Sequence, residues 1–162
     1  MDVFDSAHRI FVSYIDKSRE YYLARGYNNP YRWAHFADVP FTPLAKPLRE
    51  TRIALITTAS LPGETQREKV VFVAPSEPPP DALYTEHRSW HKTATHTRDV
   101  ESFLPIRRLA EFAGDGAIGS PSPRFYGVPT DYSQRQTIEV YAPEVLALCR
   151  ADAVDAALFL PL

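Results

Sequence analysis

Two uninterrupted apolar segments constrain the fold of this 162-residue chain more than any other feature. Residues 52–58 read RIALITT, and residues 154–160 read VDAALFL, in which six of the seven residues are apolar. A strand with one exposed face alternates polar and apolar residues, whereas a strand covered on both faces is apolar throughout. We therefore expect two parallel, neighbouring strands buried on both faces, with 154–160 as a central strand.

Helical patterns lie on either side of these strands. A first helix is expected to begin at the N-terminus, at Asp5 or Ser6, and to stop at Gly26. A second helix is expected between Pro105 and Gly114, since proline is tolerated in the first turn and glycine ends a helix. A third helical stretch, 131–150, is expected to break or bend at its internal proline.

The remaining segments are rich in proline and glycine. Residues 31–46 are expected to form an extended arm, because closely spaced prolines forbid a regular helix or an inner strand. A short strand is expected at 69–74, and a loop at 114–129.

These elements predict an α/β fold with a mostly parallel sheet and flanking helices. Residues 1–162 are expected to form a single domain, in which 1–50 contribute the N-terminal helix and the Pro-rich arm and 51–162 form the sheet core. The sheet is expected to be incomplete at the C-terminus, since a further helix would normally cover its exposed face.

Composition excludes several classes of protein. With 18 basic and 20 acidic residues the net charge is −2, and no basic run alternates with aromatics, so a nucleic-acid partner is not expected. The apolar runs are far shorter than the ~20 residues that span a bilayer, and no signal peptide is visible, which predicts a cytoplasmic location without a membrane partner. Cys149 is the only cysteine, so no intrachain disulfide can form; a buried structural thiol is expected there.

Hydroxyl groups follow the first apolar segment. Thr57, Thr58 and Ser60 would lie at the carboxyl end of a parallel strand, where hydroxyls can bind a substrate carboxylate or cap the next turn. No glycine-rich phosphate loop follows them, which argues against a nucleotide site. Within the loop 114–129, Arg124 can contact an anion, although turn chemistry explains the polar residues there equally well.

Histidines gather after residue 84. His87 and His91 have the spacing of a helical metal pair, but Arg88 stands where a general base would be needed, so no metal site and no metal hydrolase is expected. A role for histidine in positioning a carboxylate or carrying a proton near neutral pH is open, as is an exposed loop with incidental histidines.

Five segments in order carry a resemblance to a known family. They are VPFTPLAKPL at 39–48, TRIALITTASL at 51–61, DVESFLPIRRLAEFAGDGAIG at 99–119, YAPEVLALCRAD at 141–152 and VDAALFLPL at 154–162. Together they resemble the selenoprotein B family of glycine, sarcosine, betaine and D-proline reductases, and most of all the small selenoprotein subunit of D-proline reductase.

The resemblance implies reductive cleavage of a C–N bond in an amino acid, with electrons from a dithiol. In that family a selenocysteine or cysteine, with a cysteine three residues later, directly follows the strand that matches 154–162. No cofactor is expected within these residues; a pyruvoyl group on a partner subunit is implied for the D-proline enzyme. The chain is expected to stop short of the redox pair because a UGA codon was read as a stop or because the chain was cut.

The same resemblance suggests roles for individual residues. A nucleophile after Leu162 would place the substrate at the carboxyl edge of the sheet, near the three hydroxyls. His96 is then the expected proton donor for the leaving amine, with Asp99 orienting its imidazole, and Arg124 is the weaker candidate for a carboxylate anchor. The alternative function is a non-catalytic domain that lacks the redox pair and binds a partner subunit or an amino acid. The expected partners are other reductase subunits or a second copy of the chain.

Overall fold

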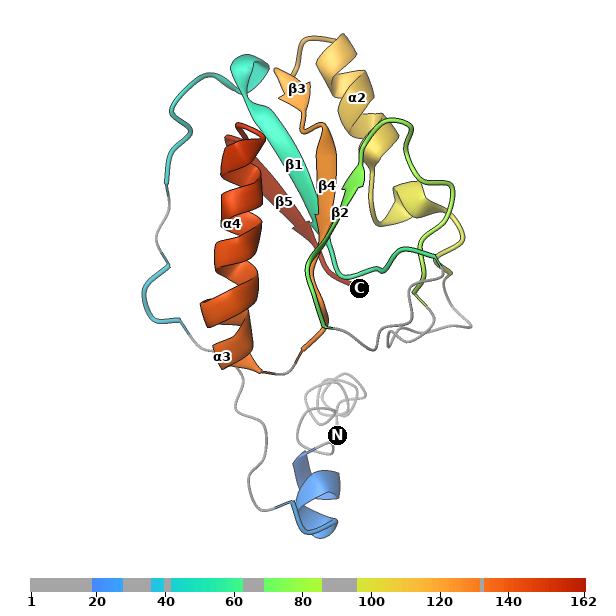
Figure 1. Cartoon of the computed structure of the whole chain (residues 1–162), viewed down its shortest axis with the longest axis vertical. Helices are drawn as coiled ribbons and strands as arrows, with labels where there is room; N and C mark the ends of the chain where they lie inside the picture. Colours follow the sequence, from blue (N-terminus) through green and yellow to red (C-terminus); the bar gives the residue numbers. More distant parts are fainter. Residues whose placement is uncertain (1–18, 28–35, 40–41, 63–68, 86–95, 132) are drawn as a thin grey trace, which may run out of the picture. The chain divides into compact units, whose positions relative to one another are not determined.

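The chain divides into two compact units, Met1–Val39 and Pro40–Leu162. The computed structural model describes residues 19–27, 36–39, 42–62, 69–85, 96–131 and 133–162 (Figure 1). The elements of the second unit are, in order, η1 (Leu48–Glu50), β1 (Arg52–Thr57), β2 (Phe72–Pro75), η2 (Val100–Ser102), α2 (Ile106–Gly114), β3 (Ser120–Pro121), β4 (Arg124–Gly127), α3 (Gln134–Gln136), η3 (Thr137–Tyr141), α4 (Ala142–Ala151) and β5 (Ala156–Leu160).

The described residues of the first unit include the end of a helix. Residues 19–24 are helical, and Gly26 follows with a φ of 85°. The Gly26 N–H donates to the Leu23 carbonyl at 3.0 Å and the Tyr27 N–H donates to the Tyr22 carbonyl at 3.1 Å, which is the Schellman pattern. Glycine ends the helix here because it adopts this left-handed conformation without strain. The expected start of the helix lies outside the described residues.

In the described part of the chain, β1 is an inner strand of a five-stranded, mostly parallel sheet. β5 runs parallel along one side of it, in a register from Ile53 opposite Ala156 to Thr57 opposite Leu160. On the other side, β3 pairs with the first residues of β1 and β4 pairs with its last residues, both in parallel. β2 pairs antiparallel with β4. The predicted α/β class is confirmed, as is the parallel pairing of the two apolar segments.

Helices cover both faces of β1. Successive residues of a strand point to opposite faces, and here Ile53 and Leu55 pack in the core cluster that includes α2. Ala54 and Ile56 pack in the other cluster, with α4 (Figure 1). The prediction that this strand is buried on both faces is therefore confirmed.

β5 is an edge strand in the described part of the chain, paired there with β1 alone. Leu158 is 46% exposed and Phe159 is 70% exposed. The prediction of a central strand buried on both faces is wrong for this segment. An apolar run reports the hydrophobicity of its side chains but not which elements cover them.

β3 and β4 lie where a loop was expected over 114–129, so that expectation is wrong for these strands. Two of the glycines in this segment, Gly119 and Gly127, permit close packing. A Cβ at Gly127 would lie 1.7 Å from Cε1 of Phe72 on β2, and one at Gly119 would lie 2.5 Å from the carbonyl carbon of Glu50. A glycine inside a strand can mark such a close approach of another segment.

The helix that contains Pro143 is continuous, which corrects the expected break. Pro143 lies in the first turn of α4, directly after the π-helical turn η3, and both Tyr141 and Ala142 keep right-handed helical angles. The wider π-helical turn accommodates Pro143, which has no N–H to donate to the preceding turn. α2, by contrast, begins after Pro105 and ends at Gly114 as predicted.

Candidate functional site

The carboxyl ends of three parallel strands meet at one edge of the sheet, which we call the carboxyl edge. β1 and β5 end there with Thr57 paired to Leu160, and β4 ends beside them with Gly127 paired to Thr57. After β1 the chain passes through β2 and η2 before α2, and after β4 it passes through α3 and η3 to α4; the two longer helices pack on opposite faces of β1. Ligands of open parallel sheets bind outside the carboxyl ends of the strands, so this edge is the first place to look for a site.

The three predicted hydroxyl residues lie at or just beyond this edge. Thr57 is fully buried, and its Oγ1 accepts a hydrogen bond at 3.2 Å from the backbone N–H two residues ahead. Oγ1 of Thr58 accepts at 2.9 Å from the N–H of Leu162. Ser60 is 5% exposed, and its backbone pairs with that of Tyr84. Thr57 therefore caps a turn, while Thr58 connects the end of β1 to the residues after β5.

His96 is held beside the chain that leaves β1. The hydroxyls of Thr85 and Thr97 form a hydrogen bond of 2.5 Å, and the residue before Thr85 is the Tyr84 that pairs with Ser60. The His96 side chain itself is exposed. These contacts tie the backbone next to His96 to the chain that follows β1.

Asp99 does not orient that imidazole. Its Oδ1 accepts at 3.1 Å from the N–H of Glu101, as the N-cap of η2. The Glu101 carboxylate in turn accepts from the N–H groups of Arg107 at 3.0 Å and Arg108 at 3.3 Å, in the first turn of α2. Between His96 and Asp99, both described, the structure contains neither a hydrogen bond nor an ion pair, so the expected pair is not formed.

Arg124 lies at the opposite end of the sheet, the amino edge, as the first residue of β4. Its Nε and Nη2 each donate to the Asp152 carboxylate at 2.8 Å. The hydroxyl of Tyr126 donates to the same carboxylate at 2.5 Å, and Nη1 of Arg52 donates to the Asp152 carbonyl at 2.7 Å. The expectation that Arg124 anchors a substrate at the carboxyl edge is therefore wrong: it binds a carboxylate of this chain, at the other edge.

We call Asp152 and its partners Arg52, Arg124 and Tyr126 the clamp. The pKa shifts within the clamp are those expected of a structural role. The hydrogen bond from Arg124 lowers the pKa of Asp152, and the same bond raises the pKa of Arg124. Burial, with the hydrogen bond to Asp152, raises the pKa of Tyr126 to about 12. Asp152, at the end of α4, is thus tied to the beginnings of β1 and β4. Near neutral pH the Asp152 carboxylate and the Arg124 guanidinium stay charged, and the Tyr126 hydroxyl stays neutral.

Sequence analysis missed a polar cluster at the carboxyl end of β4. Nζ of Lys69 lies 3.2 Å from Oδ1 of Asp131, and the hydroxyl of Tyr141 donates to Oδ2 of Asp131 at 3.3 Å. Hydrogen bonding from Lys69 lowers the pKa of Asp131, while burial and this carboxylate raise the pKa of Tyr141. A polar residue just after a strand is a usable signal, but here the strand itself had been taken for a loop.

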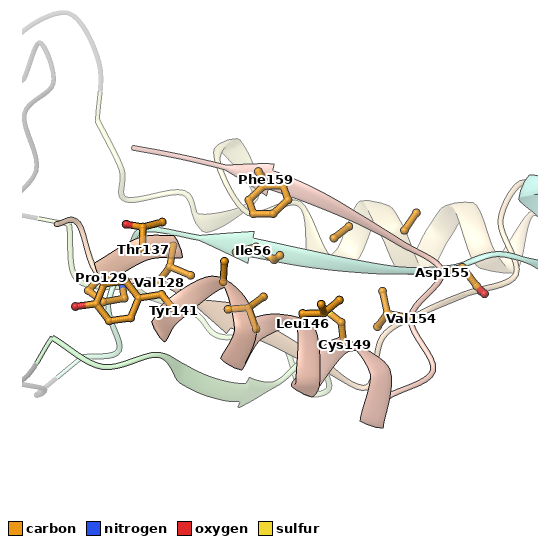
Figure 2. Close-up of a pocket in the computed structure, with 14 residues that line it drawn as sticks. Ile56, Val128, Pro129, Thr137, Tyr141, Leu146, Cys149, Val154, Asp155 and Phe159 are labelled. Carbon is orange, nitrogen blue, oxygen red and sulfur yellow. The ribbon is translucent and has the colours of Figure 1, made fainter. Parts of the chain in front are cut away.

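An apolar groove of about 460 Å³ lies between helix α4 and strands β1 and β5 (Figure 2). Tyr141 lies at one end of the groove, with Val128 and Pro129, and Asp155 lies at the other. Cys149 is half-buried in its wall, and burial raises the pKa of the thiol, so the thiol form predominates near neutral pH.

Comparison with known proteins leaves the family open. No family profile, curated protein or solved structure matches this chain. Among the described residues, no three His, Cys, Asp or Glu side chains are grouped to hold a metal ion, and His87 and His91 lie outside those residues. In the same described segments, no helix has the length and apolar character needed to cross a membrane.

Proposed function

We propose that this chain is the α/β domain of a dithiol-dependent reductase that cleaves the C–N bond of an amino acid of the D-proline or glycine, sarcosine and betaine type. The five ordered segments that resemble selenoprotein B support the proposal. It includes association with other reductase subunits.

One observation carries this proposal. β5 lies parallel beside β1, and the Leu162 N–H donates to Oγ1 of Thr58 at 2.9 Å. In the resembled family the selenocysteine or cysteine directly follows the strand that matches β5. A nucleophile in that position would emerge beside Thr58, at the edge where parallel sheets bind their ligands.

The chemistry that the resemblance implies is a two-electron reduction. A selenolate or thiolate attacks the carbon α to the carboxyl, and the C–N electron pair leaves with nitrogen, which takes up a proton. The second thiolate then attacks the selenium or sulfur, the carbon leaves with its electron pair and is protonated, and a selenide–sulfide or disulfide bond remains. An external dithiol reduces that bond and becomes a disulfide, which balances the two electrons.

His96 is the proposed donor of the proton to nitrogen. Its exposed imidazole lies on the segment tied to the end of β1 through Thr85 and Thr97. A histidine suits this role because its ordinary pKa is close to neutral. Asp99 has no direct part in it, since its carboxylate caps η2.

The test begins with the gene beyond codon 162. If codon 163 is UGA or Cys and a Cys codon follows three positions later, the extended chain is expressed with its natural residues and supplied with dithiothreitol. D-proline, glycine, sarcosine and betaine are then assayed by mass spectrometry for ring-opened 5-aminopentanoate or for acetate-type products, with and without the partner subunits encoded nearby.

In this assay, His96→Ala is expected to lower kcat by ~10²–10⁴. Ser102→Ala is the matched control, because it removes an exposed hydroxyl that donates to a backbone carbonyl near the same segment, at 2.7 Å. A downstream gene sequence without the redox pair would overturn the proposal, as would the lack of product from all four substrates. A His96→Ala variant within a few-fold of the parent would remove His96 from the mechanism.

A partner-binding domain without catalysis is the second candidate. The exposed Leu158 and Phe159 on the edge strand favour it, because an unpaired apolar edge is a template for association. The gene sequence and the product assay separate this candidate from the reductase.

A further inference from the structure

The polar cluster at the carboxyl end of β4 is assembled from three separate segments. Lys69 precedes β2, Asp131 follows β4, and Tyr141 belongs to η3. The antiparallel pairing of β2 with β4 brings the first two segments together, and η3 presents the tyrosine. The Ser133 N–H adds a third contact to this carboxylate, donating to Oδ1 of Asp131 at 3.1 Å.

This cluster adjoins the edge at which the proposed reaction takes place. The Val128 N–H donates to the Thr57 carbonyl at 2.9 Å, so the chain that leads from β4 to Asp131 starts beside the end of β1. Lys69 therefore provides a positive charge near this edge. Arg124 does not, because it lies at the amino edge.

Both charges of the pair retain hydrogen-bonding capacity. The Lys69 side chain is 58% exposed, and its contact with Asp131 uses one of the three ammonium protons. The Asp131 side chain is 14% exposed, and its Oδ2 accepts only the Tyr141 hydroxyl among the described residues. A carboxylate oxygen has two lone pairs, so Oδ2 can accept another donor.

An apolar surface begins at the same place. The Tyr141 ring, Val128 and Pro129 line the end of the groove that lies away from Asp155 (Figure 2). The hydroxyl of Tyr141 reaches Asp131, so its ring lines the groove while its polar tip contacts the charged pair.

We infer that Lys69 and Asp131 together recognise the two charges of a zwitterionic amino acid, with Lys69 binding its carboxylate and Asp131 its ammonium. A single carbon separates the two charged groups of an α-amino acid, so the ligand can bridge a carboxylate and an ammonium that lie side by side. Its apolar part then faces Tyr141 and Pro129. The inference rests on the proposed function for the class of ligand, and it assigns the residues that hold that ligand.

The first test uses the unaltered 162-residue chain, so that folding of a variant is not at issue. Binding of D-proline, glycine, sarcosine and betaine is measured by calorimetry and by ligand-detected NMR. Prolinamide, which lacks the carboxylate, and N-acetylproline, which lacks the ammonium, are each expected to bind about tenfold to a hundredfold more weakly than D-proline, because each loses one charge-assisted contact. A chain that binds none of the four zwitterions, or that binds both analogues as well as D-proline, would overturn the inference.

The second test assigns each charge to its residue. Lys69→Ala should abolish the preference for D-proline over prolinamide while keeping the preference over N-acetylproline, and Asp131→Asn should do the reverse. Lys46→Ala is the matched control, because Lys46 forms a comparable ion pair with Asp155, 2.8 Å long, at the amino edge. If both preferences for D-proline survive in Lys69→Ala and in Asp131→Asn, the ligand binds elsewhere and the inference is wrong. The same conclusion follows if Lys46→Ala changes the preferences equally.

These tests are separate from the test of the reductase. Charge-dependent binding without turnover in the extended chain would keep this inference and remove the reductase. Turnover of D-proline with an unchanged KM in Lys69→Ala would keep the reductase and overturn the inference.

Discussion

Asp152 ties together three residues of the amino edge, Arg52, Arg124 and Tyr126. Its carboxylate accepts from Arg124 and Tyr126, and its carbonyl accepts from Arg52. The side chain is only 10% exposed, so the partners would lose a bond that water replaces poorly. This differs from a surface pair such as Arg108 and Glu111, which solvent screens.

Asp152→Ala is expected to lower the free energy of unfolding by about 1–3 kcal/mol, because the buried Tyr126 hydroxyl is left without its carboxylate acceptor. Urea unfolding followed by circular dichroism measures this change. Glu111→Ala is the control, since both side chains of its ion pair with Arg108 are exposed and solvent screens the pair, so stability should change little. Equal effects of the two substitutions would contradict the clamp.

The same clamp predicts how stability depends on pH. The pKa of Asp152 is lowered in the folded protein, so its contribution is present above the ordinary aspartate pKa and is lost as the pH falls through the folded value. The pKa of Tyr126 is raised to about 12, so its contribution is present below the ordinary tyrosine pKa and is lost as the pH rises through 12. Unfolding midpoints from pH 2 to 12 should fall at both extremes, and Asp152→Asn should flatten the acid limb. An acid limb unchanged in that variant would be the contrary result.

At the level of the elements, the Phe72 ring of β2 lies against β4 because its partner there, Gly127, has no side chain. A Cβ at Gly127 would lie 1.7 Å from the Phe72 ring, whereas one at Gly114, at the end of α2, meets nothing within 4 Å. Gly127→Ala is therefore expected to cost about 1–3 kcal/mol or more, as overpacking does. Gly114→Ala should be neutral or stabilising by up to about 1 kcal/mol, because alanine favours a helix. Thermal unfolding of the two variants compares them, and a tolerated Gly127→Ala would mean that the ring can move aside.

The exposed edge strand predicts self-association. Phe159 is 70% exposed on β5, beside the apolar groove. Light scattering of the 162-residue chain should show association that increases with concentration, and Phe159→Asp should reduce it, since a charge on an edge strand opposes pairing. Phe112→Asp is the control, because Phe112 is 55% exposed on α2. A parent chain that stays monomeric at high concentration, or equal effects of the two variants, would count against this prediction.

At the level of the whole molecule, Pro40–Leu162 contains both core clusters. Every buried residue of the two clusters belongs to this unit, so it should fold without the first 39 residues. A chain that begins at Pro40 is expected to unfold cooperatively at the same midpoint as the full chain. Calorimetry compares the two, and a lower midpoint in the shorter chain would show that the first unit contributes to stability.

The sequence by itself was enough for the features that depend on neighbouring residues. Continuous apolar runs predicted two parallel strands, and Pro105 and Gly114 marked the ends of α2. The hydroxyls of Thr57 and Thr58 were also predicted correctly to lie at a strand end. Such features follow from side-chain periodicity and from local backbone preferences.

Only the tertiary structure decided which surfaces are covered and which charges meet. It placed β5 at an edge, made a strand of residues around Gly127, and paired Arg124 with Asp152 and Lys69 with Asp131. A glycine in a sequence does not reveal whether it permits a turn or leaves room for a neighbouring ring. Likewise, a lysine and an aspartate 62 positions apart give no sign of contact, because strand pairing over a long sequence separation brings them together.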